Sequence, residues 1–175
     1  MNGQGYFAIT NDGENLFLQS RSTSGVVKLS SVGEWGFFEI NSVASNWQSS
    51  GIAYDSDKDS LILFYRNLDK RNQYRSRTVD KYNILESEDN ITFTIENMDT
   101  TYHGIYAATY HDYLFYFLGV DRSHNDVLIQ TDYNYNVLST EQIEDSTVVG
   151  LGFRYGNLYL SYRDRRIELS GLEFD

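Results

Sequence analysis

The segment SGIAYDSDKDSLILFYRN, residues 50–67, is the clearest indication of the fold of this chain. Gly51 opens a short apolar run, an acidic stretch interrupts it, and Leu61 begins a longer run of aliphatic and aromatic residues. Apolar runs of this length between turn residues are typical of strands, and β-branched and aromatic side chains favour them. We therefore predict a β-hairpin with its turn at residues 55–59.

The same order of glycine, short strand, polar turn and longer strand occurs three more times. The other copies begin at Gly5, Gly104 and Gly150, and the leucines that open the four second strands are Leu16, Leu61, Leu114 and Leu158. The steps between these leucines are 45, 53 and 44 residues. Repeats of this length that contain short strands are typical of propeller blades, because stacking blades around an axis buries faces that a single blade cannot bury.

We predict one all-β domain over residues 1–175, a small β-propeller of about four blades. Its repeats are placed at about 5–50, 51–103, 104–149 and 150–175. The fourth repeat has room for residues 166–174 after its hairpin and is therefore one strand short. Two alternatives stay open at this point. The strands could form a β-sandwich or an irregular barrel, or the chain could be a half-ring that a second copy completes as a homodimer.

Residues 50–67 resemble the start of a blade in NHL-type and regucalcin-type propellers, in which a small residue and a glycine begin the inner strand and an acidic turn follows. The number of repeats is similar to that of four-bladed hemopexin-like domains, although this chain has no cysteine pair to close the ring. The resemblance implies an architecture, and function has to be argued from a site.

The charge balance limits the partners. The chain has 25 acidic and 14 basic side chains, a net charge of −11, and no cysteine. Phosphate backbones and anionic membranes repel such a protein, so neither a nucleic acid nor a membrane is expected as a partner. The N-terminus lacks the features of a signal peptide, and the longest apolar run, Tyr113–Val120, is too short to span a bilayer as a helix. We expect a cytoplasmic protein, with a secreted mature form as the alternative.

No motif predicts a catalytic residue, a metal ligand or a cofactor. Asp55, Asp57 and Asp59 alternate as in calcium loops, but an EF-hand loop needs glycine and glutamate where Ser60 and Arg66 stand. We interpret this stretch as a solvated hairpin turn. The three histidines, His103, His111 and His124, have no ligand spacing, although His103 precedes an inner strand and could line an axial channel.

The charges are distributed unevenly. Residues 64–82 contain six basic and two acidic side chains, whereas residues 83–148 contain twelve acidic and one basic. Such asymmetry indicates a binding or self-association surface, and the alternative is a solvated hairpin whose arginines pair with acidic neighbours. The candidate binding residues are cations and aromatics of the basic stretch and two tyrosines near a turn, which are expected to be exposed: Tyr65, Arg66, Arg71, Tyr74, Arg75, Arg77, Tyr133 and Tyr135. Tyr113, Phe115 and Phe117 alternate along one strand and are predicted to pack between blades.

The functional hypothesis is a non-enzymatic protein-binding module, or an inhibitor-type protein whose acidic surface blocks a basic partner. The second hypothesis is a lectin-like, glycan-binding propeller. A lectin would repeat the same pocket residues in each blade, but the turn sequences differ from blade to blade: NDGEN, DSDKDS, TYHDY and RYGN. The third is a small-ligand-binding or hydrolase-like propeller with an axial site.

Overall fold

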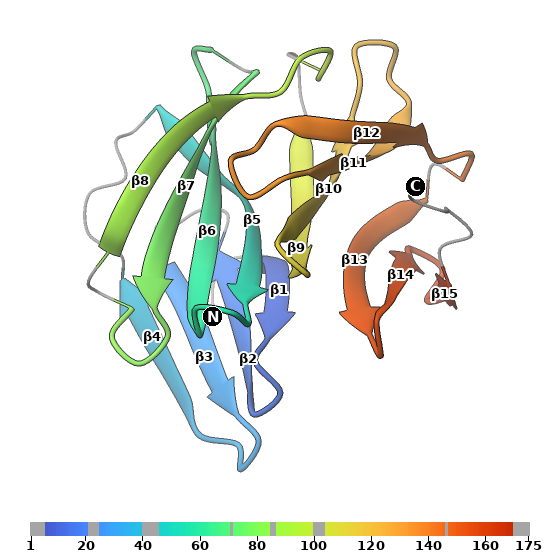
Figure 1. Ribbon diagram of the computed structural model, residues 1–175. Helices are drawn as coiled ribbons and strands as arrows, with labels where there is room; N and C mark the ends of the chain where they lie inside the picture. The colour runs from blue at the N-terminus through green and yellow to red at the C-terminus, as the bar shows by residue number, and fades with distance from the viewer. Residues whose placement is uncertain are drawn as a thin grey trace.

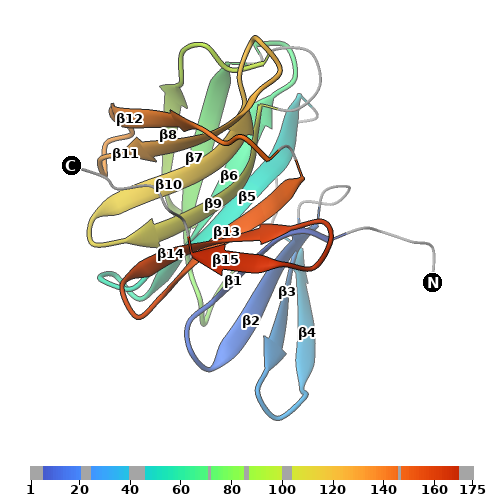
Figure 2. The same cartoon turned by 90° about the vertical axis from the view of Figure 1, so that its right-hand side faces the viewer.

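The computed structural model describes residues 6–20, 25–39, 46–70, 72–84, 87–99, 104–145 and 147–169. Four antiparallel sheets are arranged as blades around a common axis, so the protein is a four-blade β-propeller (Figures 1 and 2). The predicted all-β propeller is confirmed, and the β-sandwich alternative is not the arrangement found. The described residues include no helix that is long and apolar enough to cross a membrane.

Each blade is a meander in which strands that follow one another in the sequence pair antiparallel. Blade 1 contains β1 (Tyr6–Asn11), β2 (Asn15–Ser20), β3 (Gly25–Ser30) and β4 (Trp35–Glu39). Blade 2 contains β5 (Trp47–Asp55), β6 (Ser60–Asn67), β7 (Gln73–Asp80) and β8 (Ser87–Thr94). Blade 3 contains β9 (Ile105–His111), β10 (Leu114–Val120), β11 (Asp126–Thr131) and β12 (Val137–Gln142). Blade 4 contains β13 (Val148–Arg154), β14 (Asn157–Tyr162) and β15 (Ile167–Leu169). Over the described residues blade 4 is therefore one strand short, as its sequence predicts.

Strand β6 shows why its apolar run, residues 61–65, has no polar alternation. All eight of its residues are buried, because blade 2 is covered on both faces. Leu61 and Leu63 pack toward blade 1, whereas Ile62 and Phe64 pack toward blade 3.

The first strand of each blade lies innermost, and β1, β5, β9 and β13 pack side by side in that order. The glycine that begins the repeat at residue 51 is explained by this packing. A Cβ atom on Gly51 would lie 3.1 Å from the Cβ of Ala108 on β9. Two inner strands can approach this closely when one of them lacks a side chain.

The described residues form three hydrophobic clusters, which lie between blades 1 and 2, blades 2 and 3, and blades 3 and 4. The middle cluster is centred on Phe64, whose ring meets four other aromatic rings edge-on with centroids 5.0 to 6.4 Å apart. Phe115 and Phe117 are fully buried in it, as the alternation predicts. The prediction for Tyr113 is wrong. This residue precedes β10 in a turn, with φ of 62°, and its side chain is exposed.

Candidate functional site

The structure separates the residues of the predicted basic site between the two faces of blade 2. Tyr65 pairs with Arg75 across β6 and β7, and the adjacent residues Leu63 and Arg77 are also paired. Cross-strand partners lie on one face of a sheet, and Tyr65 and Leu63 belong to the cluster toward blade 1. Arg75 stacks 4.2 Å from the ring centre of Trp47 on the same side.

The other members of that prediction point the opposite way. Arg66 pairs with Tyr74, which is buried in the cluster toward blade 3, and Arg66 donates a hydrogen bond of 3.2 Å to Gln48. Tyr135 was expected to be exposed, but it is only 6% exposed and packs in the same cluster, so that expectation is wrong. Arg71 lies outside the described residues, as does His103.

Residues 55–59, which we call the acidic turn, belong to blade 2 and contact residues of blade 3 at one end and the Lys81 cluster beside blade 1 at the other. The carboxylate of Asp55 is fully buried, and its Oδ1 accepts hydrogen bonds from the backbone amides of Asp57 at 3.0 Å and Lys58 at 3.2 Å. Its Oδ2 accepts a bond of 2.7 Å from the hydroxyl of Tyr133, which reaches it from blade 3. The interpretation of the stretch as a turn is correct, but Asp55 is not solvated.

A pocket of about 350 Å³ opens where the acidic turn meets blade 3. Three tyrosines, two carboxylates and one ammonium line it: Asp55, Asp57, Lys58, Tyr110, Tyr113 and Tyr133. The hydroxyl of Tyr110 donates a hydrogen bond of 2.5 Å to Asp57. Burial, followed by this bond to a carboxylate, raises the pKa of Tyr110, so the phenol stays a donor.

Lys58 extends into this pocket. Its ammonium lies 4.6 Å from the ring centre of Tyr133, within the range of a cation–π interaction. The Tyr133 ring is held in place because its hydroxyl is bound to the buried Asp55. The pocket therefore combines aromatic rings with carboxylates, and one cation of the protein itself, the Lys58 ammonium, already lies over one of these rings.

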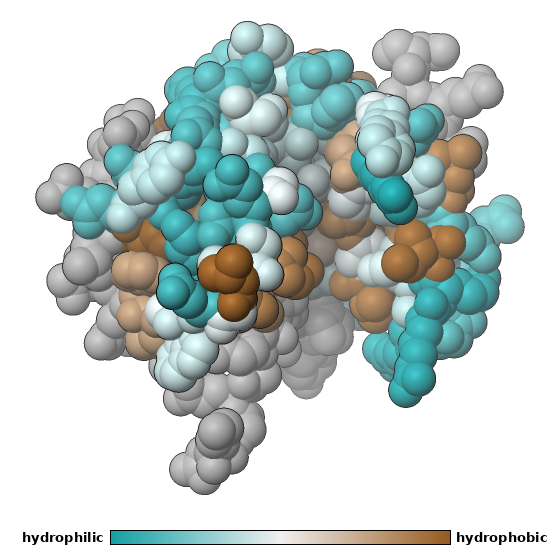
Figure 3. All heavy atoms as spheres, turned by 90° about the horizontal axis from the view of Figure 1, so that it is seen from below, coloured by the Kyte–Doolittle hydropathy of each residue, from teal (hydrophilic) through white to brown (hydrophobic). Residues whose placement is uncertain are grey.

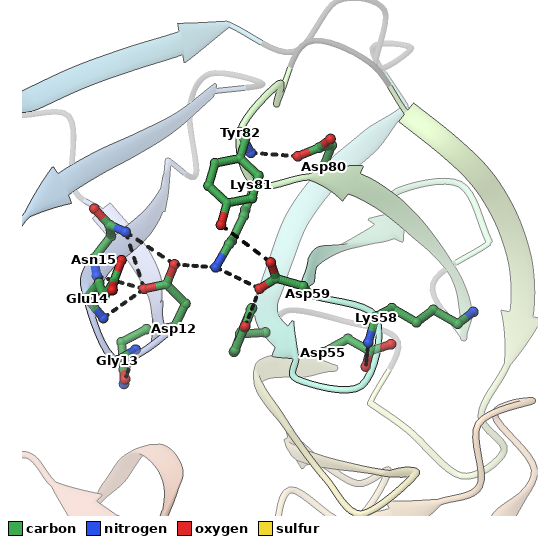
Figure 4. A network of polar contacts seen from close by, with 12 residues as sticks. Asp12, Gly13, Glu14, Asn15, Asp55, Lys58, Asp59, Asp80, Lys81 and Tyr82 are labelled. Carbon is green, nitrogen blue, oxygen red and sulfur yellow. Dashed lines mark hydrogen bonds and ion pairs between the residues drawn. The ribbon is translucent and has the colours of Figure 1, made fainter.

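The other end of the acidic turn faces blade 1 (Figure 4). Lys81, in the loop after β7, is 7% exposed and lies between Asp12 of the β1–β2 turn, at 3.1 Å, and Asp59, at 2.6 Å. Tyr54 also donates to Asp59, at 2.5 Å, and the ring of Tyr82 lies 5.0 Å from the Lys81 ammonium. This cluster ties the hairpin turns of blades 1 and 2 together.

Electrostatics within the cluster keep its members charged. Burial raises the pKa of Asp12, but backbone amides of Asn15 and Glu14 together with Lys81 outweigh burial and bring that pKa to about 2. The bond to Asp59 raises the pKa of Lys81. The same ammonium, followed by the Tyr54 hydroxyl, lowers the pKa of Asp59.

The turns after β1, β5, β9 and β13 lie toward one end of the molecule, which we call the hairpin face (Figure 1). Six carboxylates and two cations belong to these turns and their flanking residues: Asp12, Glu14, Asp55, Asp57, Asp59, Asp112, Lys58 and Arg154. Tyr113 and Tyr155 are exposed in two of the turns, and Tyr82 is exposed beside Lys81. Figure 3 views this end of the molecule and shows hydrophilic residues over much of it.

Sequence reasoning missed Tyr110, Lys58 and Lys81 as members of a site. Alternating aspartates around a lysine were the available signal at residues 55–59, but they gave no indication that tyrosines from the next blade would reach them. Within the described part of the chain, no three His, Asp or Glu side chains are close enough together to hold a metal ion. His111 stacks on Phe153, with ring centroids 4.3 Å apart, and His124 is exposed in a turn.

No protein-family model and no curated protein matches the sequence. Among solved structures, the chain is similar to virginiamycin B lyase from Staphylococcus aureus, with a TM-score of 0.54 and 13% identity over 100% of this chain and 58% of that one. It is similar to an α-L-arabinofuranosidase from Clostridium thermocellum, with a TM-score of 0.60 and 12% identity over 89% and 59%. It is also similar to the WD40 β-propeller domain of Doa1, with a TM-score of 0.54 and 13% identity over 95% and 64%.

The chain thus spans less than two thirds of the length of each of these proteins. At such low identities the likeness shows the fold alone. The neighbours include two enzymes and a WD40 domain, so they favour no particular activity for this chain. The comparisons support the β-propeller fold that the strands and clusters show.

Proposed function

We propose that the protein is a binding module rather than an enzyme, and that it binds a basic segment of a partner protein on its hairpin face. The observation that carries the proposal is the pocket between blades 2 and 3, which tyrosine rings and carboxylates line and where the ammonium of Lys58 lies over the ring of Tyr133. A lysine or arginine side chain of a partner is the same kind of group.

The pocket is suited to a cation for two reasons. The face of a tyrosine ring attracts an ammonium or guanidinium group by about 0.5 to 2 kcal/mol, depending on how far the pair is desolvated. Asp57 is exposed at the pocket and offers a carboxylate for a charge-assisted hydrogen bond. Asp55 and Asp57 also hold the hydroxyls of Tyr133 and Tyr110, so two of the rings are oriented before a ligand arrives.

The surroundings of the pocket favour the same partner. A net charge of −11 attracts basic proteins over long distances and raises the rate of encounter. Exposed tyrosines such as Tyr113 and Tyr82 supply the amphipathic contact area that protein interfaces use. The arginines of β6 and β7, Arg66, Arg75 and Arg77, are divided between the two faces of blade 2 and have no part in this proposal.

Calorimetric titration with a short oligolysine peptide tests the proposal, and an oligoglutamate peptide is the charge control. The wild-type protein should bind oligolysine and not oligoglutamate. Lys58→Ala should tighten oligolysine binding, because the internal cation no longer occupies the pocket. Tyr113→Ala should weaken it, whereas Tyr155→Ala, which removes another exposed tyrosine but one outside the pocket, should leave it unchanged.

Two outcomes of these titrations would contradict the proposal. If Lys58→Ala and Tyr113→Ala bind oligolysine as the wild type does, the peptide responds to net charge alone and the pocket is not the site. If a neutral disaccharide binds instead, and Tyr113→Ala abolishes that binding, the ligand is a glycan and the basic partner is abandoned.

A further inference from the structure

Among the described residues, blades 1 and 4 each leave one face uncovered. Blades 2 and 3 are packed on both sides, but the three hydrophobic clusters of the described residues include none between blade 4 and blade 1. Within the described strands, β13 does not pack against β1 as β5 packs against β1 and β9. Figure 3 shows the molecule hollowed between its two sides, with hydrophobic residues on both.

The uncovered face of blade 1 is apolar across all four strands. Because Phe17 and Val26 are buried toward blade 2, alternation places their sequence neighbours on the opposite face. Direct strand pairing aligns these neighbours in two rows, Ile9–Leu18–Val27–Phe37 and Leu16–Leu29–Trp35. Ile9 is 57% exposed, Phe37 47% and Trp35 74%, which is unusual for side chains of this size in a sheet.

The uncovered face of blade 4 has the same character. Leu158 and Leu160 are buried toward blade 3, so Tyr159 and Ser161 lie on the other face of β14. Their partners on β15 are Leu169 and Ile167, which are 58% and 70% exposed.

We propose that two copies of the chain associate head to tail, with the uncovered face of blade 4 in one copy covering that of blade 1 in the other. At each of the three blade junctions, the face of one blade that is directed toward the next blade in the chain packs on the face of that next blade. Among the described residues, the face of blade 4 that is directed away from blade 3 and the face of blade 1 that is directed away from blade 2 have no such contact. One chain therefore carries both halves of the missing junction, and a two-fold pair of copies forms that junction twice.

The size of the faces is adequate for a dimer. Four strands about 4.8 Å apart and five residues long make the blade 1 face roughly 20 by 17 Å across. Each copy uses this face, roughly 340 Å² in area, together with the smaller blade 4 face, which corresponds to the small and weakly associating interfaces that bury less than about 1,200 Å² in total. The eleven side chains named on these faces carry no charge, which matters for two chains of net charge −11 that repel one another.

Sedimentation equilibrium of the full chain over a range of concentrations, at low and high salt, tests the proposal. A dimer should form, and high salt should strengthen it, because salt screens the repulsion between the copies and does not weaken apolar contacts. Binding of a basic partner to the hairpin face responds to salt in the opposite sense, so the two proposals fail separately.

Charged substitutions on each face locate the contact. Phe37→Lys on blade 1 and Ile167→Lys on blade 4 should each weaken the dimer by roughly tenfold or more, because a charge would be buried in an apolar contact. Val32→Lys is the matched control, since Val32 is 80% exposed in the β3–β4 turn and off the face. Circular dichroism confirms that each variant folds. A chain that is monomeric at every concentration and salt, or a dimer that neither Phe37→Lys nor Ile167→Lys weakens, overturns the proposal.

Discussion

Replacing Asp12 by asparagine should destabilise the protein at neutral pH and remove part of its acid sensitivity. The Asp12 side chain is fully buried between blades 1 and 2. It accepts hydrogen bonds from the backbone amides of Glu14 at 3.0 Å and Asn15 at 2.7 Å, and it pairs with Lys81 at 3.1 Å. An asparagine keeps the acceptor oxygen for the turn but loses the charge that the ammonium faces.

The magnitude follows from the pKa of Asp12, which is lowered from 3.8 to about 2. One pKa unit corresponds to about 1.4 kcal/mol, so the full shift would be worth about 2.4 kcal/mol. Solvent reaches the cluster through the half-exposed Asp59, and screening reduces the contribution to about 1 to 2 kcal/mol. Because the folded-state pKa is depressed, this stabilisation is complete above the unfolded pKa of 3.8 and is lost as the pH falls toward 2.

Urea unfolding of the wild type and Asp12→Asn at neutral pH and near pH 2 measures the effect. The free energy of unfolding should differ by about 1 to 2 kcal/mol at neutral pH, and the difference should shrink in acid. Asp145→Asn is the control, because the pKa of Asp145 is also lowered to about 2 but by partners on an exposed surface, and its loss should be smaller. A difference in unfolding free energy between wild type and Asp12→Asn that is the same at both pH values would contradict this role for the Asp12 charge.

Three further substitutions test the packing, each measured by urea unfolding. Phe64→Ala should cost about 3 to 5 kcal/mol, since a fully packed ring between blades 2 and 3 is removed; a loss below about 1 kcal/mol would contradict that packing. Gly104→Ala should cost about 2 kcal/mol, because φ is 55° and the new Cβ would lie 2.6 Å from the Tyr74 hydroxyl, whereas Gly152→Ala, with open space around it, should be near neutral. Tyr133→Phe removes one donor from a fully buried carboxylate and should cost about 1 to 2 kcal/mol; an unchanged stability would show that water replaces the hydroxyl.

The architecture could be predicted because its signals are local. Strand and turn preferences act within a few residues. Hairpins that begin with a glycine and have a second strand opened by a leucine recur along the chain, and the steps of 44 to 53 residues between these leucines indicated repeated units. Stacking around an axis follows from the burial that such hairpins need.

The candidate binding residues could not be predicted in the same way. Tyr65 and Tyr74 both lie in one basic stretch, yet they point to opposite faces of blade 2 because of the strand positions they occupy. Tyr135 stands in a polar turn and has a φ of 65°. Its ring nevertheless packs into the core, with its centroid 4.1 Å from that of Phe93. Whether an aromatic side chain is a contact surface or core depends on which blade covers it.

The acidic turn shows where the division lies. Local preference is enough to predict a hairpin with its turn at residues 55–59, because aspartate oxygens bind the backbone amides that follow them. The burial of Asp55 under Tyr133 and the contact of Asp59 with Lys81 depend instead on how the blades pack. These partners come from segments 78 and 22 positions away, and chain folding, not local preference, brings them within hydrogen-bonding distance.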